Sequence, residues 1–375
     1  MKIQPFAVEQ WMNAYETRCR YNLAETCVES LTLEQLLGLA GKRDSILGEL
    51  LPLKLTYGAI EGSVRLRAAV AALYAASAPS DVMIAHGAIG ANSLVYQALV
   101  ERGDHVVAIV PNYQQHYSIP ESIGAEVSKL RLREEDGFMP DLDALRSLVR
   151  PGTTLISLSN PNNPTGALLG RDELAEIARI AESVGAWVVC DEVYRGTTQI
   201  GDELTPSIVD ITPRGIAIGS MSKAFSLAGL RLGWIVAPHE VLAAAEIHRD
   251  YNTISVGMLD DHVAAIALEH SEAILARSRA VVRTNLAVVD RWVAGEPAIQ
   301  YVRPKAGTIT LLRYEHPMPS REFCVRLMEQ AGVLFTPGSA LDMEGYIRIG
   351  YANNIAAIEA GLPLTSAFLR SLPAP

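Results

Sequence analysis

Residues 220–234 read SMSKAFSLAGLRLGW and contain a single lysine, Lys223. Two short apolar runs, Ile216–Gly219 and Gly233–Ala237, lie on either side of this loop. Runs that are apolar throughout are typical of strands covered on both faces of a sheet. Since side chains at the ends of such strands face the crevice of an open sheet, the stretch predicts an α/β fold with Lys223 in its crevice.

Similar runs recur upstream and alternate with amphipathic helical patterns. The remaining predicted strands are Val82–His86, His105–Val110, Glu126–Leu130, Thr154–Ser159 and Trp187–Cys190. Repeated strand-helix order supplies the crossovers that parallel strands require. The sequence therefore predicts a large α/β domain over residues 48–258, with a mostly parallel sheet flanked by helices.

The pattern changes after residue 258. Long helices are predicted from Leu259 to Val293, followed by a strand over Gly307–Tyr314, a helix from Ser320 and a strand over Tyr346–Tyr351. This mixture predicts a smaller α+β domain over residues 259–375. We expect the N-terminal segment, residues 1–47, to pack with that smaller domain.

Composition excludes several function classes. The 375 residues carry a formal net charge of −10 and no run of basic residues that could follow a phosphate backbone, so we expect no nucleic-acid partner. No apolar stretch has the length of a membrane span or a signal peptide, so we expect no membrane partner and a cytoplasmic location. The four cysteines form no C-x-x-C pair, so neither a disulfide framework nor a metal site is indicated.

The surroundings of Lys223 favour a role in chemistry, although a lone lysine is more often a solvated surface residue. Ser220 and Arg231 offer a hydroxyl and a guanidinium that could bind a phosphate. Gly229 and Gly233 permit a close approach of the backbone.

The stretch resembles the lysine motif of fold-type I pyridoxal phosphate enzymes, specifically the class I/II aminotransferases, which has the form S-x-x-K with an arginine eight residues later. The resemblance implies that Lys223 holds pyridoxal 5'-phosphate as an internal aldimine. It also assigns Ser220 and Arg231 to the cofactor phosphate.

Other motifs follow in the order of that family. Residues 160–166 read NPNNPTG, which alone indicates a turn. In the family, the asparagine that corresponds to Asn163 bonds the phenolic oxygen of the cofactor and borders the substrate. Asp191 closes a predicted strand and could simply cap a turn, but the resemblance pairs it with the pyridine nitrogen. Tyr194 would bond the same oxygen as Asn163.

Two upstream turns match the phosphate and ring contacts of the family. Gly87, Ala88 and Ile89 link a predicted strand to a helix, so their N–H groups could bind the phosphate. Tyr113 ends the next strand region, and the resemblance stacks it on the pyridine ring. Ordinary packing of a loop is the alternative for Tyr113.

Two further matches concern the substrate and the assembly. Arg348 lies in an apolar strand, where it either forms a structural salt bridge or, by resemblance, binds the substrate α-carboxylate. Tyr57 stands five residues before Gly62 and resembles a family tyrosine that reaches the cofactor phosphate of the neighbouring subunit. The resemblance therefore implies a homodimer with shared active sites.

These residues imply a transaminase that converts an L-amino acid to a 2-oxo acid, with a second 2-oxo acid as a possible acceptor. The same residues also serve lyases and cyclases that act by β- or γ-elimination. Residues 21–33 lack the Gly-x-Pro pattern of many aminotransferases and resemble capreomycidine-synthase-like cyclases of hydroxylated arginine. Glu25 would then bind a cationic side chain, unless it is simply solvated. A non-catalytic, aminotransferase-like regulator is the remote alternative.

Overall fold

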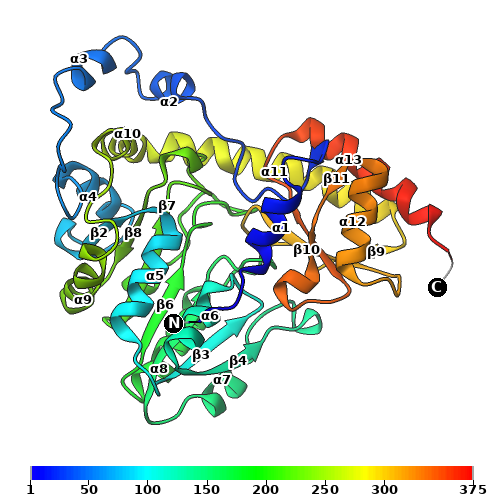
Figure 1. Ribbon diagram of the computed structural model, residues 1–375, viewed down its shortest axis with the longest axis horizontal. Helices are drawn as coiled ribbons and strands as arrows, with labels where there is room; N and C mark the ends of the chain where they lie inside the picture. The colour runs from blue at the N-terminus through cyan, green and yellow to red at the C-terminus, as the bar shows by residue number, and fades with distance from the viewer. Residues whose placement is uncertain (1, 374–375) are drawn as a thin grey trace.

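The computed structural model describes residues 2–373, and its centre is a sheet of seven strands (Figure 1). The strand order across the sheet is β2-β8-β7-β6-β5-β3-β4. The strands are β2 (Val82–Ala85), β3 (His105–Val110), β4 (Glu126–Arg131), β5 (Thr153–Ser159), β6 (Trp187–Asp191), β7 (Gly215–Ser220) and β8 (Gly233–Val236). Each predicted strand of the large domain is therefore present, with ends that differ by one residue at most.

The sheet is mostly parallel, as the sequence predicted. Strands β4, β3, β5, β6 and β7 pair in parallel, whereas β8 runs antiparallel to both β7 and β2. The carboxyl ends of the five parallel strands therefore meet at one edge of the sheet. Asp191 is the last residue of β6 and Ser220 the last of β7, so both lie at that edge.

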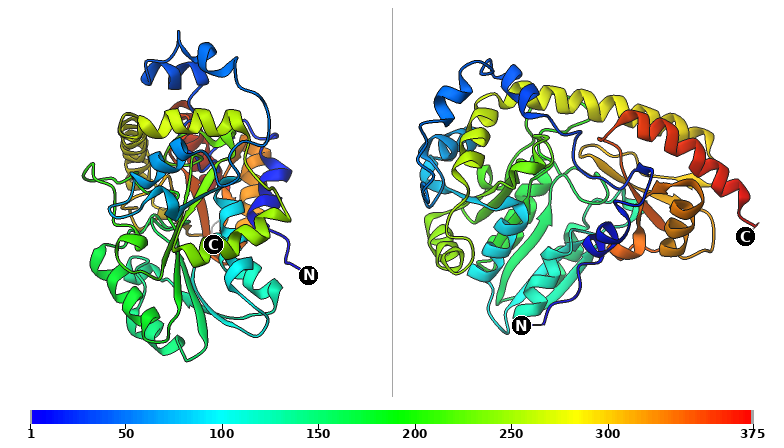
Figure 2. Two further views of the ribbon diagram at one scale, coloured as in Figure 1. Left: turned by 90° about the vertical axis from the view of Figure 1, so that its left-hand side faces the viewer. Right: turned by 45° about the horizontal axis from the view of Figure 1, so that its top comes forward.

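Helices cover both faces of this sheet (Figures 1 and 2). One face packs on α5 (Gly87–Leu99), α6 (Gln115–Ile123) and α9 (His239–Asp250). The opposite face packs on α4 (Val64–Ala71), α7 (Leu142–Leu148), α8 (Arg171–Glu182) and α10 (Met258–Glu269). Burial on both faces explains why the strands are apolar throughout rather than alternating.

A smaller antiparallel sheet follows, with the strand order β12-β13-β10-β9. Its strands are β9 (Ile299–Gln300), β10 (Ile309–Tyr314), β12 (Thr336–Pro337) and β13 (Tyr346–Gly350), and its helices are α12 (Ser320–Ala331) and α13 (Ile355–Ser371). The helix α11 (Ser271–Gly295) contributes Leu275 to the core of the large sheet and Leu286 to the core of the small one.

The N-terminal segment crosses between the two sheets. Its first helix, α1 (Ala7–Tyr15), buries Trp11, whose indole N–H donates to the Phe335 carbonyl at 2.9 Å. Strand β1 (Tyr21–Asn22) then pairs in parallel with β11 (Val333–Leu334). Helices α2 (Leu33–Leu39) and α3 (Ile46–Leu50) lead away from it, and Leu37 and Ile46 pack on Ile266 of α10. Among residues 2–373, no helix combines the length and the apolar character needed to cross a membrane.

Candidate active site

A cavity of about 300 Å3 opens at the carboxyl edge of the large sheet. Its lining includes residues from four of the parallel strands or the loops that follow them, among them Asn112, Ser159, Asp191 and Ser220. The small sheet contributes Arg348, and the N-terminal segment contributes both α1 and residues 24–27. The site is therefore built between the two sheets, with the N-terminal segment as one side.

Asp191 lies at the base of the cavity and is 6% exposed. The Asn92 side-chain amide donates to its Oδ2 at 3.0 Å, and the His116 Nε2 lies 3.8 Å from the same oxygen. The backbone N–H of Val193 donates to Oδ1 at 3.2 Å. These contacts orient a buried carboxylate toward the cavity, where it can pair with a protonated ring nitrogen.

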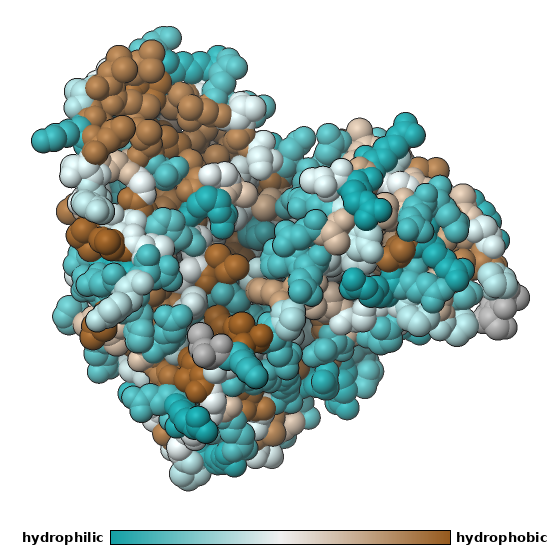
Figure 3. All heavy atoms as spheres, in the orientation of Figure 1, coloured by the Kyte–Doolittle hydropathy of each residue, from teal (hydrophilic) through white to brown (hydrophobic). Residues whose placement is uncertain are grey.

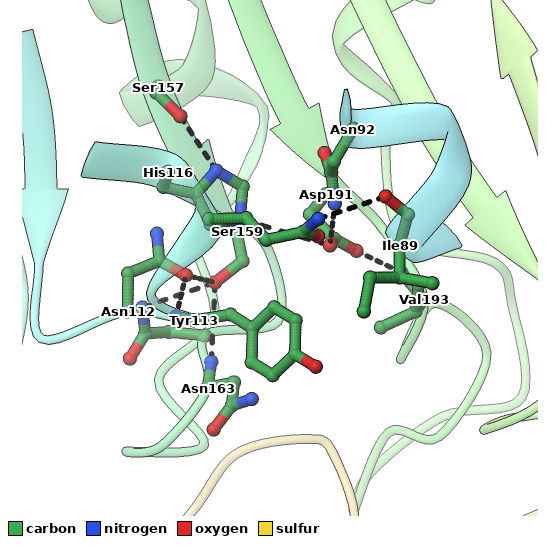
Figure 4. Close-up of polar contacts among 12 residues, drawn as sticks. Ile89, Asn92, Asn112, Tyr113, His116, Ser157, Ser159, Asn163, Asp191 and Val193 are labelled. Atoms are coloured by element: carbon green, nitrogen blue, oxygen red, sulfur yellow. Dashed lines mark hydrogen bonds and ion pairs between the residues drawn. The ribbon is translucent and has the colours of Figure 1, made fainter. Parts of the chain in front are cut away.

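A buried polar network lies behind Asp191, as Figure 4 shows around His116. The Nδ1 atom of His116 lies 2.7 Å from the Ser157 hydroxyl and 2.8 Å from the Tyr96 hydroxyl. The two hydroxyls are 2.5 Å apart. Burial raises the pKa of Tyr96, so the phenol stays protonated and able to donate. The imidazole ring is thus held from behind, with Nε2 directed at Asp191.

A second polar cluster supports the motif at residues 160–166 (Figure 4). The Ser159 hydroxyl donates to Asn112 Oδ1 at 2.8 Å and accepts the backbone N–H of Asn163 at 3.3 Å. Asn112 Oδ1 also accepts the backbone N–H of Tyr113 at 2.8 Å. The loops that carry Asn163 and Tyr113 are therefore joined through two buried side chains.

The loop after β7 and the start of α5 form a cradle for an anion. Ser220 Oγ donates to Ser222 Oγ at 3.0 Å, and Arg231 Nη1 lies 3.5 Å from the same Ser222 oxygen. A Cβ atom on Gly233 would lie 2.5 Å from the backbone nitrogen of Ala88, so only glycine lets this loop approach the helix so closely. The N-terminus of α5, two hydroxyls and a guanidinium are donors that fit the phosphate of pyridoxal phosphate.

Arg348 is 2% exposed and lies in the cavity wall opposite Asp191's sheet. Its Nη1 donates to Asn163 Oδ1 at 3.3 Å and its Nη2 to Thr336 Oγ1 at 3.1 Å. Its Nε has no hydrogen-bond partner among residues 2–373, and both groups that accept its other protons are neutral. Burial lowers the pKa of this guanidinium. A buried cation without an anionic hydrogen-bond partner favours binding of a carboxylate from outside.

Lys223 is half-buried, and its Nζ faces the N-terminal segment. The amine donates to Thr26 Oγ1 at 2.5 Å and lies 3.5 Å from Cys27 Sγ. Burial lowers the pKa of this amine, but Cys27, Tyr194 and Glu25 together outweigh burial and raise it. Free of the cofactor, Lys223 is therefore an ammonium held by the protein.

Three glutamates of the N-terminal segment line the cavity. Glu9 and Glu16 are seven residues apart in and just after α1, and Glu25 follows in the next segment. Glu9 accepts the Tyr113 hydroxyl at 2.7 Å, and Glu25 accepts the backbone N–H groups of Thr26 and Cys27 at 2.9 and 3.0 Å. Burial, and then the charges of Glu25 and Glu9, raise the pKa of Glu16. The side of the cavity formed by the N-terminal segment thus carries three acidic side chains.

The structure brings together most of the residues that the sequence singled out. Those lining the cavity are Glu25, Ala88, Ile89, Tyr113, Asn163, Asp191, Tyr194, Ser220, Lys223, Arg231 and Arg348. Gly87 is not in the lining but begins α5 with a φ of 66°. Tyr57 lies outside the cavity of its own chain and is 69% exposed. Gly229 needs a correction, because a Cβ atom there would meet no protein atom within 4 Å.

Sequence reasoning missed several residues of the site. Thr26 and Cys27 line the cavity from residues 21–33, whose only signal was the missing Gly-x-Pro pattern, and Glu9 and Glu16 line it from α1 and the residue after it. Asn92 and His116 contact Asp191 from α5 and α6. A polar residue on an otherwise buried helix face was the available signal for these two, since buried polar groups need partners.

Comparison with known proteins identifies the family. The sequence model for aminotransferase class I and II matches residues 53–359. The chain is 32% identical over 365 residues to capreomycidine synthase of Streptomyces vinaceus, which covers 96% of this chain and 92% of the relative.

Two solved structures are similar over nearly the whole chain. A PLP-dependent aminotransferase from Streptococcus suis 89-1591 is 41% identical, with a TM-score of 0.96 and 100% of both chains covered. The PLP-dependent cyclase OrfR is 28% identical, with a TM-score of 0.91 and 99% and 98% of the two chains covered. The relatives thus include both an aminotransferase and a cyclase.

Proposed function

The chain belongs to the class I and II aminotransferases, pyridoxal phosphate enzymes of fold type I, and from this premise we propose that it transaminates an L-amino acid to a 2-oxo acid. Lys223 is the amine that would hold the cofactor aldehyde, and Ser220, Arg231 and the turn Gly87–Ile89 would hold its phosphate. Tyr113 would cover the ring, and Asn163 and Tyr194 would bind its phenolic oxygen.

The bound cofactor supplies an aldehyde for the substrate amine and a protonated ring that withdraws electrons from Cα. Asp191 keeps the ring nitrogen protonated, because its carboxylate is buried and fixed by Asn92 at 3.0 Å. Once its amine is free, Lys223 would remove the proton from Cα and return it to the other end of the reacting bond system, on the same face. Arg348 fixes the α-carboxylate of the substrate, so that Cα is presented to Lys223.

One observation carries this proposal. A buried carboxylate, a lysine and a buried guanidinium converge on a single cavity, from β6, the loop after β7 and β13, and the guanidinium Nε has no hydrogen-bond partner in the part of the chain that the structure describes. An amino acid has the matching groups: an amine to react, a Cα proton to lose and a carboxylate to bind. The full-length similarity to a PLP-dependent aminotransferase supports the same reaction.

A second candidate function is elimination and ring closure on a hydroxylated arginine-like amino acid. The acidic side of the cavity formed by Glu9, Glu16 and Glu25 favours a substrate with a cationic side chain. The similarity to capreomycidine synthase and to the cyclase OrfR points in the same direction. Loss of the Cα proton to Lys223 is common to both candidates, which diverge only afterwards.

Product analysis distinguishes the two reactions. The holoenzyme is incubated with neutral, acidic and cationic amino acids, including a β-hydroxylated arginine, with and without a 2-oxo acid acceptor. Transamination requires the acceptor for multiple turnovers and yields a 2-oxo acid in mass spectrometry. Elimination and cyclisation proceed without an acceptor and yield a product lighter by one water. Absence of both products across the panel would contradict the proposed function.

We also propose that the enzyme acts as a homodimer with shared sites. Tyr57 is exposed, and so are the apolar side chains of Leu47, Leu51, Leu55, Ile60, Val64 and Tyr251. Figure 3 shows a gathering of hydrophobic side chains over α2 and α3. A contiguous apolar surface of this kind favours association with another protein surface. A second copy would bury Tyr57 against its partner's cavity.

Mixed variants test the shared site. Lys223→Ala and Tyr57→Ala chains are each expected to lose most activity alone. Their heterodimer contains one site with Lys223 from one chain and Tyr57 from the other, so mixing should restore activity. A chain carrying both Tyr57→Ala and Arg348→Ala serves as the negative control, because it provides Lys223 without Arg348. A fully active monomer in sedimentation would contradict the dimer.

A further inference from the structure

The amine of Lys223 meets a hydroxyl that the proposed chemistry has not yet used. Lys223 Nζ donates to Thr26 Oγ1 at 2.5 Å, although the two residues are 197 positions apart in the chain. The thiol of Cys27 lies 3.5 Å from the same nitrogen. The segment that carries both groups is the one in which the sequence departs from the Gly-x-Pro pattern of many aminotransferases.

Thr26 is held in place from several sides. Its backbone N–H donates to Glu25 Oε1 at 2.9 Å, and its carbonyl accepts the Thr308 hydroxyl at 2.6 Å. The neighbouring carbonyl of Glu25 lies so close to Gly350 that a Cβ atom there would be 1.7 Å from it. The segment is therefore packed against the small sheet, and the hydroxyl is presented to Lys223 from a fixed backbone.

The polarity of these groups is consistent with Thr26 accepting a hydrogen bond from Lys223. Burial raises the pKa of the Tyr194 phenol, while Lys223, Arg348 and a hydrogen bond with Thr26 act in the opposite direction. A hydroxyl that donates its proton toward Tyr194 keeps its lone pairs available for the lysine. Thr26 thus lies between the amine and the phenol.

A neutral amine has two N–H donors and one lone pair, arranged as a tetrahedron around nitrogen with Cε. If Thr26 accepts one N–H and the weaker Cys27 sulfur accepts the other, the lone pair is the position left for the reacting proton. A base works best when its lone pair is already aimed at the proton it removes. Without these acceptors, the amine would rotate freely about the Cε–Nζ bond.

We propose that Thr26 is a positioning residue for Lys223. Whenever the amine is free of the cofactor, the Thr26 hydroxyl holds it with the lone pair that takes up the proton directed toward the substrate. This inference rests on the proposed function only for its kinetic consequence. The contact itself belongs to the protein and can be tested without substrate.

The kinetic test compares Thr26→Val, which keeps the shape of the side chain and removes the hydroxyl, with Thr26→Ser, which keeps the hydroxyl. We expect Thr26→Val to lower kcat about 10- to 100-fold with KM changed about twofold at most, since proton transfer by a positioned group contributes about 10²–10⁴-fold. Its isotope effect with a Cα-deuterated substrate should rise above that of the wild type. Thr26→Ser should restore both values.

The second readout uses the apoenzyme. Reductive methylation with formaldehyde and cyanoborohydride, followed by peptide mass spectrometry, reports the reactivity of Lys223 as a function of pH. Loss of the Thr26 acceptor destabilises the ammonium, so the midpoint should move to lower pH in Thr26→Val and stay near wild type in Thr26→Ser. Cys27, Tyr194, Glu25 and Arg348 also face the amine and are unchanged in both variants. Cys27→Ala measures the part due to the thiol.

Both the kinetic test and the methylation test have outcomes that would overturn the proposal. A wild-type isotope effect and methylation midpoint in Thr26→Val would overturn the proposal, as would a Thr26→Ser variant that is as impaired as Thr26→Val. Thr26→Ala replaces Thr26→Val if the latter unfolds, which thermal melting reveals. If the wild type fails to convert any amino acid, the proposed function fails, but the methylation midpoints still support or refute the role of Thr26.

Discussion

The floor of the cavity, meaning Asp191, Ser220 and Lys223 on or just after two strands of the large sheet, contrasts with its wall, meaning residues 7–16 and 21–27. The floor residues follow the family motifs and belong to parallel strands buried on both faces. Residues 21–27 of the wall lack the Gly-x-Pro pattern of many aminotransferases, and they are attached to the small sheet through β1 and β11. Its side chains are also more exposed, and three of them are glutamates.

The contrast separates two tasks of the enzyme. In the proposed function, the floor supplies the groups that both candidate reactions share, namely a lysine and a carboxylate for the ring nitrogen. The wall contacts the free lysine and, in the same proposal, would face the substrate side chain and influence the later course of the reaction. The similar solved structures include both an aminotransferase and a cyclase.

The largest effect is expected from removing the floor lysine. Lys223→Ala should lower turnover at least about 10³-fold, because the proton-transfer group is lost. The variant should still bind the cofactor, since Asp191, Arg231 and the start of α5 remain. Absorbance titration measures that binding. Borohydride reduction of the wild-type holoenzyme should leave the pyridoxyl group on Lys223, and its recovery on Lys54 or another lysine would refute the assignment.

The second-largest effect is expected from removing the charge of Asp191. Asp191→Asn keeps the size of the side chain and removes its charge, so the ring nitrogen loses the group that keeps it protonated. We expect kcat to fall about 10²–10³-fold, the usual range for one electrostatic contact to the transition state. Cofactor affinity should fall as well, because a charge-assisted hydrogen bond contributes about 1.5–3 kcal/mol. Turnover equal to that of the wild type would contradict the role of Asp191.

A third prediction concerns the stability of the floor. Glu192 follows Asp191, is 4% exposed and accepts the Ser207 hydroxyl at 2.8 Å, and burial raises its pKa to about 7. Folding favours the protonated form of Glu192. Its contribution to the free energy of unfolding is therefore fully present below about pH 4.5 and is lost as the pH rises through about 7. The loss corresponds to about 3 kcal/mol.

Glu192→Gln should therefore remove this part of the pH dependence. The free energy of unfolding, measured in urea at several values between pH 4.5 and 8, should fall less steeply with rising pH in the variant than in the wild type. Other groups titrate equally in both proteins, so the difference between the two curves isolates Glu192. Parallel curves would show that its pKa is not raised.

The smallest effect is expected at the wall. Glu16→Gln removes one negative charge from the wall of the cavity, so KM for a cationic amino acid should rise about fivefold, with little change in kcat. KM for a neutral amino acid should stay the same. Glu34→Gln on the exposed face of α2 is the matched control, because it removes the same charge outside the cavity. Equal effects of the two changes on KM would argue against a cationic substrate.

The floor could be predicted from the sequence because its residues occupy strand ends. Asp191 and Ser220 each end a continuous apolar run, and parallel topology brings such ends to one edge. Family motifs then suggested a role for each residue. Those roles, including that of Tyr57 toward a second subunit, and the domain limits at residues 47 and 258 stay predictions.

The wall could not be predicted in the same way. Thr26 meets Lys223 across 197 positions, and no local pattern shows which loop will pack against a given strand end. Glu9 and Glu16 share a helical face with Met12, but periodicity alone does not say that this face borders a cavity. Glu25 was singled out for a substrate side chain, whereas its Oε1 accepts two backbone N–H groups of its own segment.

The attachment of the wall to the small sheet places Arg348 and Thr26 on a common support. Arg348 belongs to β13, and Leu23 of the wall accepts the backbone N–H of Gly350 at the end of the same strand, at 2.8 Å. Arg348 and Thr26 are thus tied to one strand, while Lys223 follows β7 of the other sheet. If Arg348 binds the carboxylate as proposed, a bound amino acid would bridge the two sheets. The group that binds the carboxylate and the group that contacts the lysine would then share one support.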